Sequence, residues 1–257
     1  MQDTMSEPII KVIEENYEIP QLNATRKISA LLPSDYYETD KRYPVLYLQD
    51  GQNLFHPEAP YGNWAIDKSM AKLKKEGFGD IIIVAVDHGE EERITEYLPY
   101  KHPRFGDGKG KFYIQFLIEK LIPYINKNYR TLTDFEHTGI GGSSMGGLIS
   151  LHAGLRNPGV FGKMMIFSPS LWISKIIFDH TKNFSPLQES KIYLYAGGKE
   201  SIEHLPNAKR LGTIIKDKMV KGYHIDFHFS INNEGSHSEI YWREEFPKAV
   251  KWLFYNP

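Results

Sequence analysis

Short β-rich runs, several of them apolar throughout, alternate along this chain with longer stretches whose apolar residues recur at helical spacing. The run at 81–86 reads Ile-Ile-Ile-Val-Ala-Val, which is typical of a strand that is covered on both faces. Runs of this kind predict strands at Val45–Gln49, Ile81–Val86, Thr138–Gly141, Lys163–Phe167, Ile192–Ala196 and Ile225–Ile231.

The stretches between these runs are predicted to be helices, and a further helix is expected near the C-terminal end. Their apolar positions place them at Trp64–Lys75, Phe112–Asn126, Met145–Arg156, Ala208–Lys221 and Tyr241–Tyr255. Asn63 and Asn207 precede two of them as N-cap candidates, and Gly77 is expected to end the first. Pro123 and Pro247 fall inside two of the predicted helices, where proline is expected to kink a helix or to begin a new segment.

Alternation of strands and helices predicts an α/β fold with a mostly parallel central sheet and helices on both faces. The N-terminal part differs, because β-type runs at Ile9–Ile19 and Ala24–Leu32 have no helix between them. These two runs are expected to form an antiparallel pair at the edge of the sheet. No repeat or linker-like shift in composition divides the chain, so residues 1–257 are expected to form a single domain.

Composition narrows the possible partners. The chain is 41% hydrophobic and 25% charged, as in an ordinary globular protein with a sizeable core. Its formal net charge of −1 gives no electrostatic reason to expect nucleic acid or an anionic membrane as a partner. No apolar run is long enough to cross a bilayer, and the first residues lack the features of a signal peptide. We therefore expect a cytoplasmic protein, and the alternative is a mature secreted form from which the leader has been removed.

The first candidate catalytic motif is Gly142-Ser143-Ser144-Met145-Gly146, which lies between a predicted strand and a predicted helix. A serine in that position, with glycine two residues before and two after, is a nucleophile elbow. The turn is sharp, so side chains at the two glycine positions would collide with their surroundings. Ser144 fits this register, whereas Ser143 has no glycine two residues after it. The alternative is an ordinary glycine-rich turn.

A serine nucleophile needs a base, and the base needs an acid that orients it. In α/β-hydrolases these groups follow the serine in the order acid, then histidine. Glu200 stands in the turn after the strand 192–196, which makes it the first choice for the acid, and Glu203 is close enough to compete. His237 stands between the last predicted strand and the last helix, where the base is expected.

Two backbone N–H groups are expected to form the oxyanion hole. One belongs to Met145, directly after the nucleophile, and the other to Gln52, in the loop after the strand Val45–Gln49. Gly51 would let the backbone turn toward the substrate, although an ordinary Asp-Gly turn would give the same sequence.

No metal or other cofactor is expected. The absence of cysteine excludes disulfides, thiol nucleophiles and cysteine-ligated metals. His224, Asp226 and His228 alternate along one predicted strand, a spacing that could ligate a metal. We interpret them instead as the polar face of a strand whose other face is apolar.

Taken together, these motifs resemble the Putative esterase family of the α/β-hydrolases, which includes esterase D, siderophore esterases and feruloyl and acetyl-xylan esterases. The resemblance runs from Tyr43 to Phe254. It rests on residues 43–53, Arg93 with Glu96-Tyr97, and residues 129–131, 142–148, 168–172 and 235–239. It implies the α/β-hydrolase fold, a triad at Ser144, Glu200 and His237, and oxyanion donors at Gln52 and Met145. Many members of the family carry aspartate where this chain has Glu200.

The substrate pocket is expected to form from loops at the carboxyl edge of the sheet. The long segment 96–111 contributes Tyr97, and the insertion 171–189 contributes Trp172, both as candidate substrate contacts. Arg93 and Glu96 are expected to form a structural ion pair rather than to touch the substrate.

These expectations predict a cofactor-independent serine esterase that hydrolyses a small-molecule or carbohydrate-linked carboxylic ester through an acyl-enzyme. The same site could instead transfer an acyl group to a sugar or another alcohol, and a non-catalytic binding domain could have kept the elbow. The sequence identifies neither the acyl nor the alcohol group, and it leaves the oligomeric state open.

Overall fold

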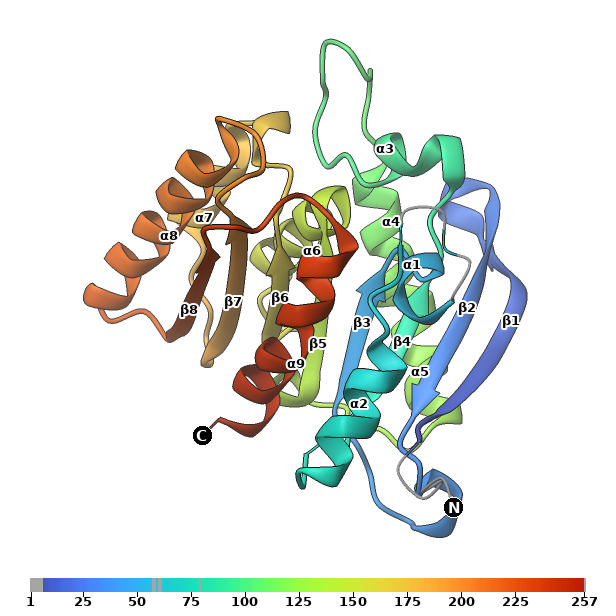
Figure 1. The fold of residues 1–257 in the computed structure, drawn as a ribbon. Coiled ribbons are helices and arrows are strands. Elements are labelled where there is room, and N and C mark those ends of the chain that lie inside the picture. Colours follow the sequence, from blue (N-terminus) through green and yellow to red (C-terminus); the bar gives the residue numbers. More distant parts are fainter. Residues whose placement is uncertain (1–6, 57–58, 60–61, 79, 257) are drawn as a thin grey trace.

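Eight strands form one continuous sheet in the computed structural model, which describes residues 7–56, 59, 62–78 and 80–256 (Figure 1). Their order across the sheet is β1-β2-β4-β3-β5-β6-β7-β8. The strands from β3 to β8 run parallel, whereas β1 and β2 pair antiparallel at one edge. The strands are β1 (Ile9–Ile19), β2 (Ala24–Leu32), β3 (Val45–Gln49), β4 (Ile82–Val86), β5 (Thr138–Ser143), β6 (Lys163–Phe167), β7 (Ser190–Gly197) and β8 (Ile225–Asn232).

Helices cover both faces of this sheet, as the strand–helix alternation predicts. The helices are α1 (Gln52–Phe55), α2 (Ile66–Lys75), α3 (Arg93–Glu96), α4 (Gly110–Phe116), α5 (Ile122–Asn128), α6 (Ser144–Arg156), α7 (Ile176–Asn183), α8 (His204–Val220) and α9 (Glu239–Tyr255). None of these helices in the described part of the chain combines the length and the apolar composition that a membrane span requires. The predicted fold class, a mostly parallel sheet with an antiparallel N-terminal edge, is confirmed.

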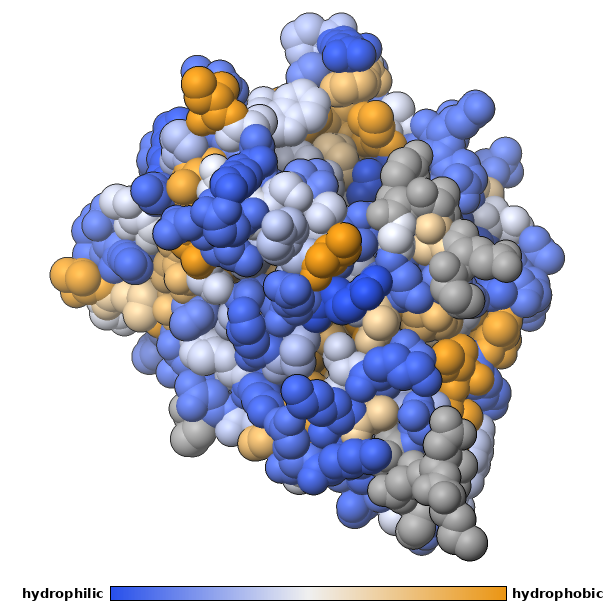
Figure 2. All heavy atoms as spheres, viewed as in Figure 1, coloured by the Kyte–Doolittle hydropathy of each residue, from blue (hydrophilic) through white to orange (hydrophobic). Residues whose placement is uncertain are grey.

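The two faces of the sheet belong to two hydrophobic clusters, because successive side chains of a strand point to opposite sides. In β3, Val45 and Tyr47 belong to the cluster that includes residues of α4, α6 and α8, whereas Leu46 and Leu48 belong to the cluster that includes residues of α2 and α9. Over α2 and α9 the outer surface is mostly hydrophilic (Figure 2). These helices therefore bury an apolar face against the sheet and present a polar face to solvent.

Neither of the two predicted N-cap residues lies at the cap position of its helix. Asn207 is not an N-cap, because α8 begins at His204 and takes in Pro206 in its first turn, where proline costs no backbone hydrogen bond. Asn63 also lies outside the cap position of α2, although its side chain accepts a hydrogen bond from the N–H of Ala65. Gly77 does follow the end of α2, with a φ of +85°.

The two internal prolines behave differently. The predicted helix Phe112–Asn126 is divided into α4, a π-helical turn at Leu117–Leu121, and α5, and Pro123 lies in the first turn of α5. The π turn interrupts the regular i→i−4 hydrogen bonds just before Pro123, which has no N–H to donate, so the chain accommodates this proline. Pro247, by contrast, lies inside a single continuous helix, α9.

The sheet brings the chemistry-bearing loops to one edge. Strand β3 lies between β4 and β5, so the connections after β3 and after β5 leave in opposite directions across the sheet. A crevice opens outside the carboxyl ends of strands at such a switch point. Asp50 directly follows β3, and Ser144 directly follows β5.

The junction of β5 and α6 has the tight geometry that the glycines of the elbow imply. Ser144 begins α6 with a φ of +56°, a left-handed conformation that costs a residue with a side chain about 1–2 kcal/mol. A Cβ on Gly142 would lie 2.9 Å from the carbonyl carbon of Gly146, and one on Gly146 would lie 3.0 Å from the Cβ of Gln49. Neither position has room for a side chain.

Gly142→Ala is therefore expected to destabilise the protein by about 1–3 kcal/mol, because the added methyl group meets backbone that cannot move aside. Urea denaturation followed by circular dichroism measures the change. Gly159→Ala is the matched control, since a Cβ there meets no atom within 4 Å and should change the stability little. Equal stability of the two variants would contradict this account of the elbow.

Candidate active site

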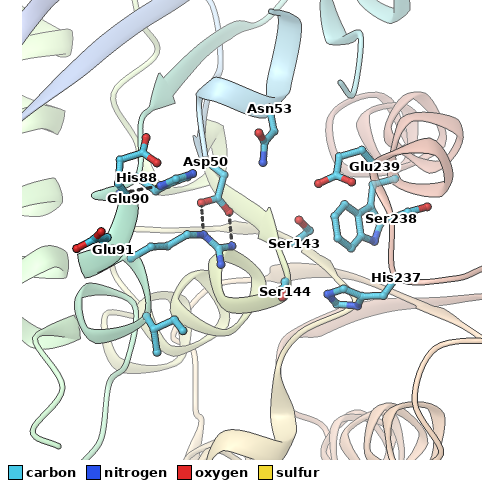
Figure 3. Close-up of a pocket in the computed structure, with 13 residues that line it drawn as sticks. Asp50, Asn53, His88, Glu90, Glu91, Ser143, Ser144, His237, Ser238 and Glu239 are labelled. Carbon is cyan, nitrogen blue, oxygen red and sulfur yellow. Dashed lines mark hydrogen bonds and ion pairs between the residues drawn. The ribbon is translucent and has the colours of Figure 1, made fainter. Parts of the chain in front are cut away.

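A pocket of about 840 Å³ opens at the switch point of the sheet (Figure 3). It lies between the segments that follow β3, β4 and β5 and the segment that leads into α9. Its walls are formed by Asp50, Asn53, His88, Glu90, Glu91, Arg93, Ile94, Ser143, Ser144, His237, Ser238, Glu239 and Trp242. Ser144 and His237, predicted from widely separated motifs, thus share one cavity.

His237 is held by a carboxylate. Its Nδ1 lies 2.6 Å from Oε2 of Glu200, whose side chain is only 1% exposed. An ionised carboxylate can only accept hydrogen bonds, so Nδ1 carries a proton, and in the neutral imidazole Nε2 is then the nitrogen with the free lone pair. Figure 3 shows the imidazole beside Ser144, although no hydrogen bond joins these two described side chains.

Glu200 is itself fixed by two further donors. Its Oε1 accepts hydrogen bonds from the hydroxyl of Ser168 and from the N–H of Gly197, each at 2.7 Å. Burial alone would raise the pKa of Glu200, but the hydrogen bonds from His237 and Ser168 outweigh it and lower that pKa below its usual range. The carboxyl group is therefore ionised at neutral pH. Glu203 is exposed at the N-terminal end of α8.

Two residues that the sequence reasoning did not assign to the site complete this network. Ser168, at a φ of +42° and fully buried, follows β6 and accepts a hydrogen bond at 3.0 Å from Nε1 of Trp242. The ring of Trp242 meets the imidazole of His237 edge to face, with centroids 5.0 Å apart. The only signal for Ser168 was its place in a family motif. Trp242 is one of the regularly spaced apolar residues of α9, so its sequence context indicated only core packing.

The Oγ of Ser144 lies 3.3 Å from Oγ of Ser170, within hydrogen-bonding distance. The N–H of Ser170 also donates to the carbonyl of Ser144 at 3.0 Å. Met145 lies in the first turn of α6, where backbone N–H groups have no partner within the helix. These contacts fix the turn that carries Ser144.

Gln52 begins α1 on the opposite side of the crevice. Its side chain accepts from the N–H of His88 at 2.9 Å and donates to the carbonyl of His88 at 3.1 Å, which ties the turn after β3 to the end of β4. A Cβ on Gly51 would lie 2.4 Å from Oδ1 of Asp87, so a side chain there would force Asp87 to move. The role of the Gln52 N–H in an oxyanion hole stays a prediction.

The expected ion pair between Arg93 and Glu96 is wrong. Arg93 makes a bidentate pair with Asp50, with Nε 2.6 Å from Oδ1 and Nη2 2.8 Å from Oδ2. Glu96 pairs instead with Arg26 of β2. Although burial opposes it, the charge of Asp50 raises the pKa of Arg93. Each charge has a partner that lies far away in the sequence, so the local spacing of Arg93 and Glu96 did not decide the pairing.

Asp50 and Arg93 set the electrostatics of the pocket. Among the described residues, Arg93 is the only lysine or arginine in its wall, and Asp50 neutralises it. Glu90, Glu91 and Glu239 add three carboxyl groups, and burial raises the pKa of Glu239. The pocket is therefore poorly suited to an anionic ligand.

The two predicted substrate contacts lie elsewhere. Tyr97 is fully buried and its ring packs on that of Tyr113, with centroids 5.1 Å apart, so the structure places it in the core. Trp172 is 53% exposed and lines a second pocket of about 300 Å³ together with Ile202 and Arg210.

Metal-ligating side chains gather at one place in the described part of the chain. Glu200, His204 and His237 bring one ligand atom each to within 4.8 Å of one another. His224, Asp226 and His228, the set considered from the sequence, form no such group among the described residues.

Comparison with known proteins identifies the family of this chain and similar folds. The model of the family described as Putative esterase matches residues 19–253. The uncharacterized protein YbbA of Bacillus subtilis is 26% identical over 245 residues, which cover 89% of this chain and 92% of YbbA. The structure of the BES protein from Bacillus cereus has a TM-score of 0.75 at 22% identity and covers 99% of this chain and 97% of its own. That of an IroE-like serine hydrolase from Shewanella oneidensis has a TM-score of 0.74 at 19% identity, over 96% and 80%.

Arg93→Met is expected to cost about 3–5 kcal/mol of stability, because it leaves Asp50 buried, with a side chain only 6% exposed, and unpaired. Urea denaturation measures the loss. Lys101→Met is the control, since Lys101 and its partner Asp107 are both 82% exposed and such pairs contribute little. A loss no larger than that of the control would show that the Asp50–Arg93 pair is not structurally important.

Proposed function

Because this chain belongs to the Putative esterase family, we propose that it hydrolyses a carboxylic ester through an acyl-enzyme formed on Ser144. The observation that carries the proposal is the 2.6 Å hydrogen bond between His237 Nδ1 and Glu200 Oε2, beside Ser144 in one pocket. Family membership supports ester hydrolysis in general. The assignment of nucleophile, base and acid rests on this geometry.

In the first half of the reaction, the Oγ of Ser144 attacks the carbonyl carbon of the ester while Nε2 of His237 takes the hydroxyl proton. Glu200 stabilises the imidazolium that forms and keeps the ring in the required tautomer. The backbone N–H groups of Met145 and Gln52 are the proposed donors to the oxyanion. His237 then passes its proton to the leaving alcohol, and an acyl-serine remains.

In the second half, a water molecule loses a proton to Nε2 of His237 and attacks the acyl-serine, which releases the acid and regenerates Ser144. The Ser144–His237 hydrogen bond is expected to form only when substrate is bound, since such bonds are often long in unliganded enzymes. No step requires a cofactor.

The pocket favours hydrolysis over transfer of the acyl group to another alcohol. Transfer requires an acceptor site that keeps water away from the acyl-enzyme, whereas the side chain of His237 is 41% exposed. The carboxyl groups of the wall favour neutral esters, including carbohydrate-linked ones, over esters that carry negative charge. A non-catalytic binding role would not need the ordered network around Glu200.

Ser144→Ala is expected to abolish ester hydrolysis, by up to about 10⁶-fold in kcat as in the subtilisin comparison that gives this scale. Hydrolysis of p-nitrophenyl acetate and labelling by a fluorophosphonate probe measure the effect. Ser143→Ala is the control and should keep both activity and labelling. Labelling of the Ser144→Ala variant, or its undiminished turnover, would refute the assignment of the nucleophile.

Glu200→Gln is expected to lower kcat strongly, by about 10⁴-fold on the same scale, because the imidazole loses the group that fixes its tautomer. Glu203→Gln should have nearly wild-type kcat, since Glu203 is exposed, whereas the buried Glu200 holds Nδ1 of His237. Steady-state kinetics of both variants decide between the two carboxylates. Loss of activity in Glu203→Gln alone would move the role to Glu203, and wild-type rates in both would indicate a serine–histidine dyad.

A further inference from the structure

His204 presents a buried nitrogen that the proposed mechanism does not use. It is the first residue of α8, and its side chain is 6% exposed. Its Nε2 lies 3.1 Å from Oε2 of Glu200, yet it makes no hydrogen bond. A buried polar atom without a partner costs about 1–3 kcal/mol, so its presence calls for an explanation.

The nitrogen lies close to the same carboxylate oxygen that His237 contacts. Oε2 of Glu200 is 2.6 Å from Nδ1 of His237 and 3.1 Å from Nε2 of His204, and all three atoms lie within 4.8 Å of one another. Tetrahedral zinc with bonds of about 2.0–2.2 Å places its ligands about 3.4 Å apart. Small side-chain movements would bring the three atoms to that spacing.

The surroundings are those of a metal ligand set. Oε1 of Glu200 is anchored by Ser168 and Gly197, which leaves Oε2 to face the two imidazoles. Ligating carboxylates are commonly fixed by outer hydrogen bonds in this way. Two imidazole nitrogens and one carboxylate oxygen suit Zn²⁺, whereas Mg²⁺ prefers oxygen ligands throughout. The exposed side chain of His237 gives an ion a route from solvent.

We propose that Glu200, His204 and His237 form a Zn²⁺ site whose occupation inhibits the enzyme. Zinc replaces the hydrogen bond between His237 and Glu200, with Nδ1 of His237, Nε2 of His204 and Oε2 of Glu200 as ligands and water in the fourth position. A neutral imidazole has one N–H, so coordination through Nδ1 moves the proton of His237 to Nε2. That nitrogen then cannot take the proton of Ser144. Inhibition rests on the proposed esterase function, but zinc binding does not.

The first test is zinc inhibition of ester hydrolysis. Zinc sulfate added to wild-type enzyme in a metal-free, non-chelating buffer should inhibit saturably, EDTA should restore activity, and Mg²⁺ should have no effect. His204→Gln should remain active but require about tenfold or more zinc for the same inhibition, because one ligand is lost. His224→Gln is the control and should behave as wild type, because His224 is exposed and directly precedes β8. Equal zinc sensitivity of His204→Gln and wild type would overturn the site.

The second test measures binding without activity and without replacing His204. In Ser144→Ala, Co²⁺ should give the visible absorption of a tetrahedral site, and zinc should displace it. Zinc should also shift the ¹⁵N resonances of His204 Nε2 and His237 Nδ1 in the same protein. Unchanged His204 resonances at saturating zinc would refute the proposal even if His204→Gln failed to fold. If the wild-type protein bound zinc but hydrolysed no ester, that result would count against the esterase function alone.

Discussion

The candidate site depends on one buried carboxylate, Glu200. It is almost fully removed from solvent and receives hydrogen bonds from a side chain after β6, a backbone N–H at the end of β7 and an imidazole on the loop after β8. A charge in such a place persists only if its oxygens are satisfied. Because three donors meet that demand, Glu200 connects three neighbouring strand ends and determines the orientation and tautomer of His237.

A second buried pair defines the other wall of the pocket. Asp50 has a left-handed backbone conformation at the end of β3, and its two oxygens receive the guanidinium of Arg93. The bidentate geometry fixes both partners more firmly than a single contact would. Ser144 lies between these two fixed walls, so an ester that enters the pocket meets a rigid arrangement of groups.

The same carboxylate oxygen of Glu200 also lies close to a second histidine, His204. Oε2 of Glu200 already receives the proton of His237, and the Nε2 of His204 approaches that oxygen without a hydrogen bond. An arrangement that orients a base for catalysis thereby also resembles the beginning of a metal coordination shell. In this protein the choice between the two depends on which nitrogen of His237 carries its proton.

The sequence by itself determined the features that depend on local geometry. Short β-rich runs predicted the strands of the sheet to within a few residues. The glycines around Ser144 predicted a tight turn without room for side chains at the glycine positions. The order of the motifs also named Ser144, Glu200 and His237 together. Local sterics and the two periodicities act over only a few residues, so they can be read directly from the chain.

Only the tertiary structure decided which distant side chains meet. Arg93 pairs with Asp50 rather than with Glu96, and Tyr97 is buried in the core. Ser168 donates a hydrogen bond to Glu200 and accepts one from Trp242. The ionic partners Asp50 and Arg93 are 43 positions apart, and Ser168 and Trp242 are 74 apart. Such pairings follow from which loops the parallel strands bring to one edge and from the need to satisfy every buried charge. Neither condition can be recognised from the residues that neighbour Arg93, Ser168 or Tyr97 in the sequence.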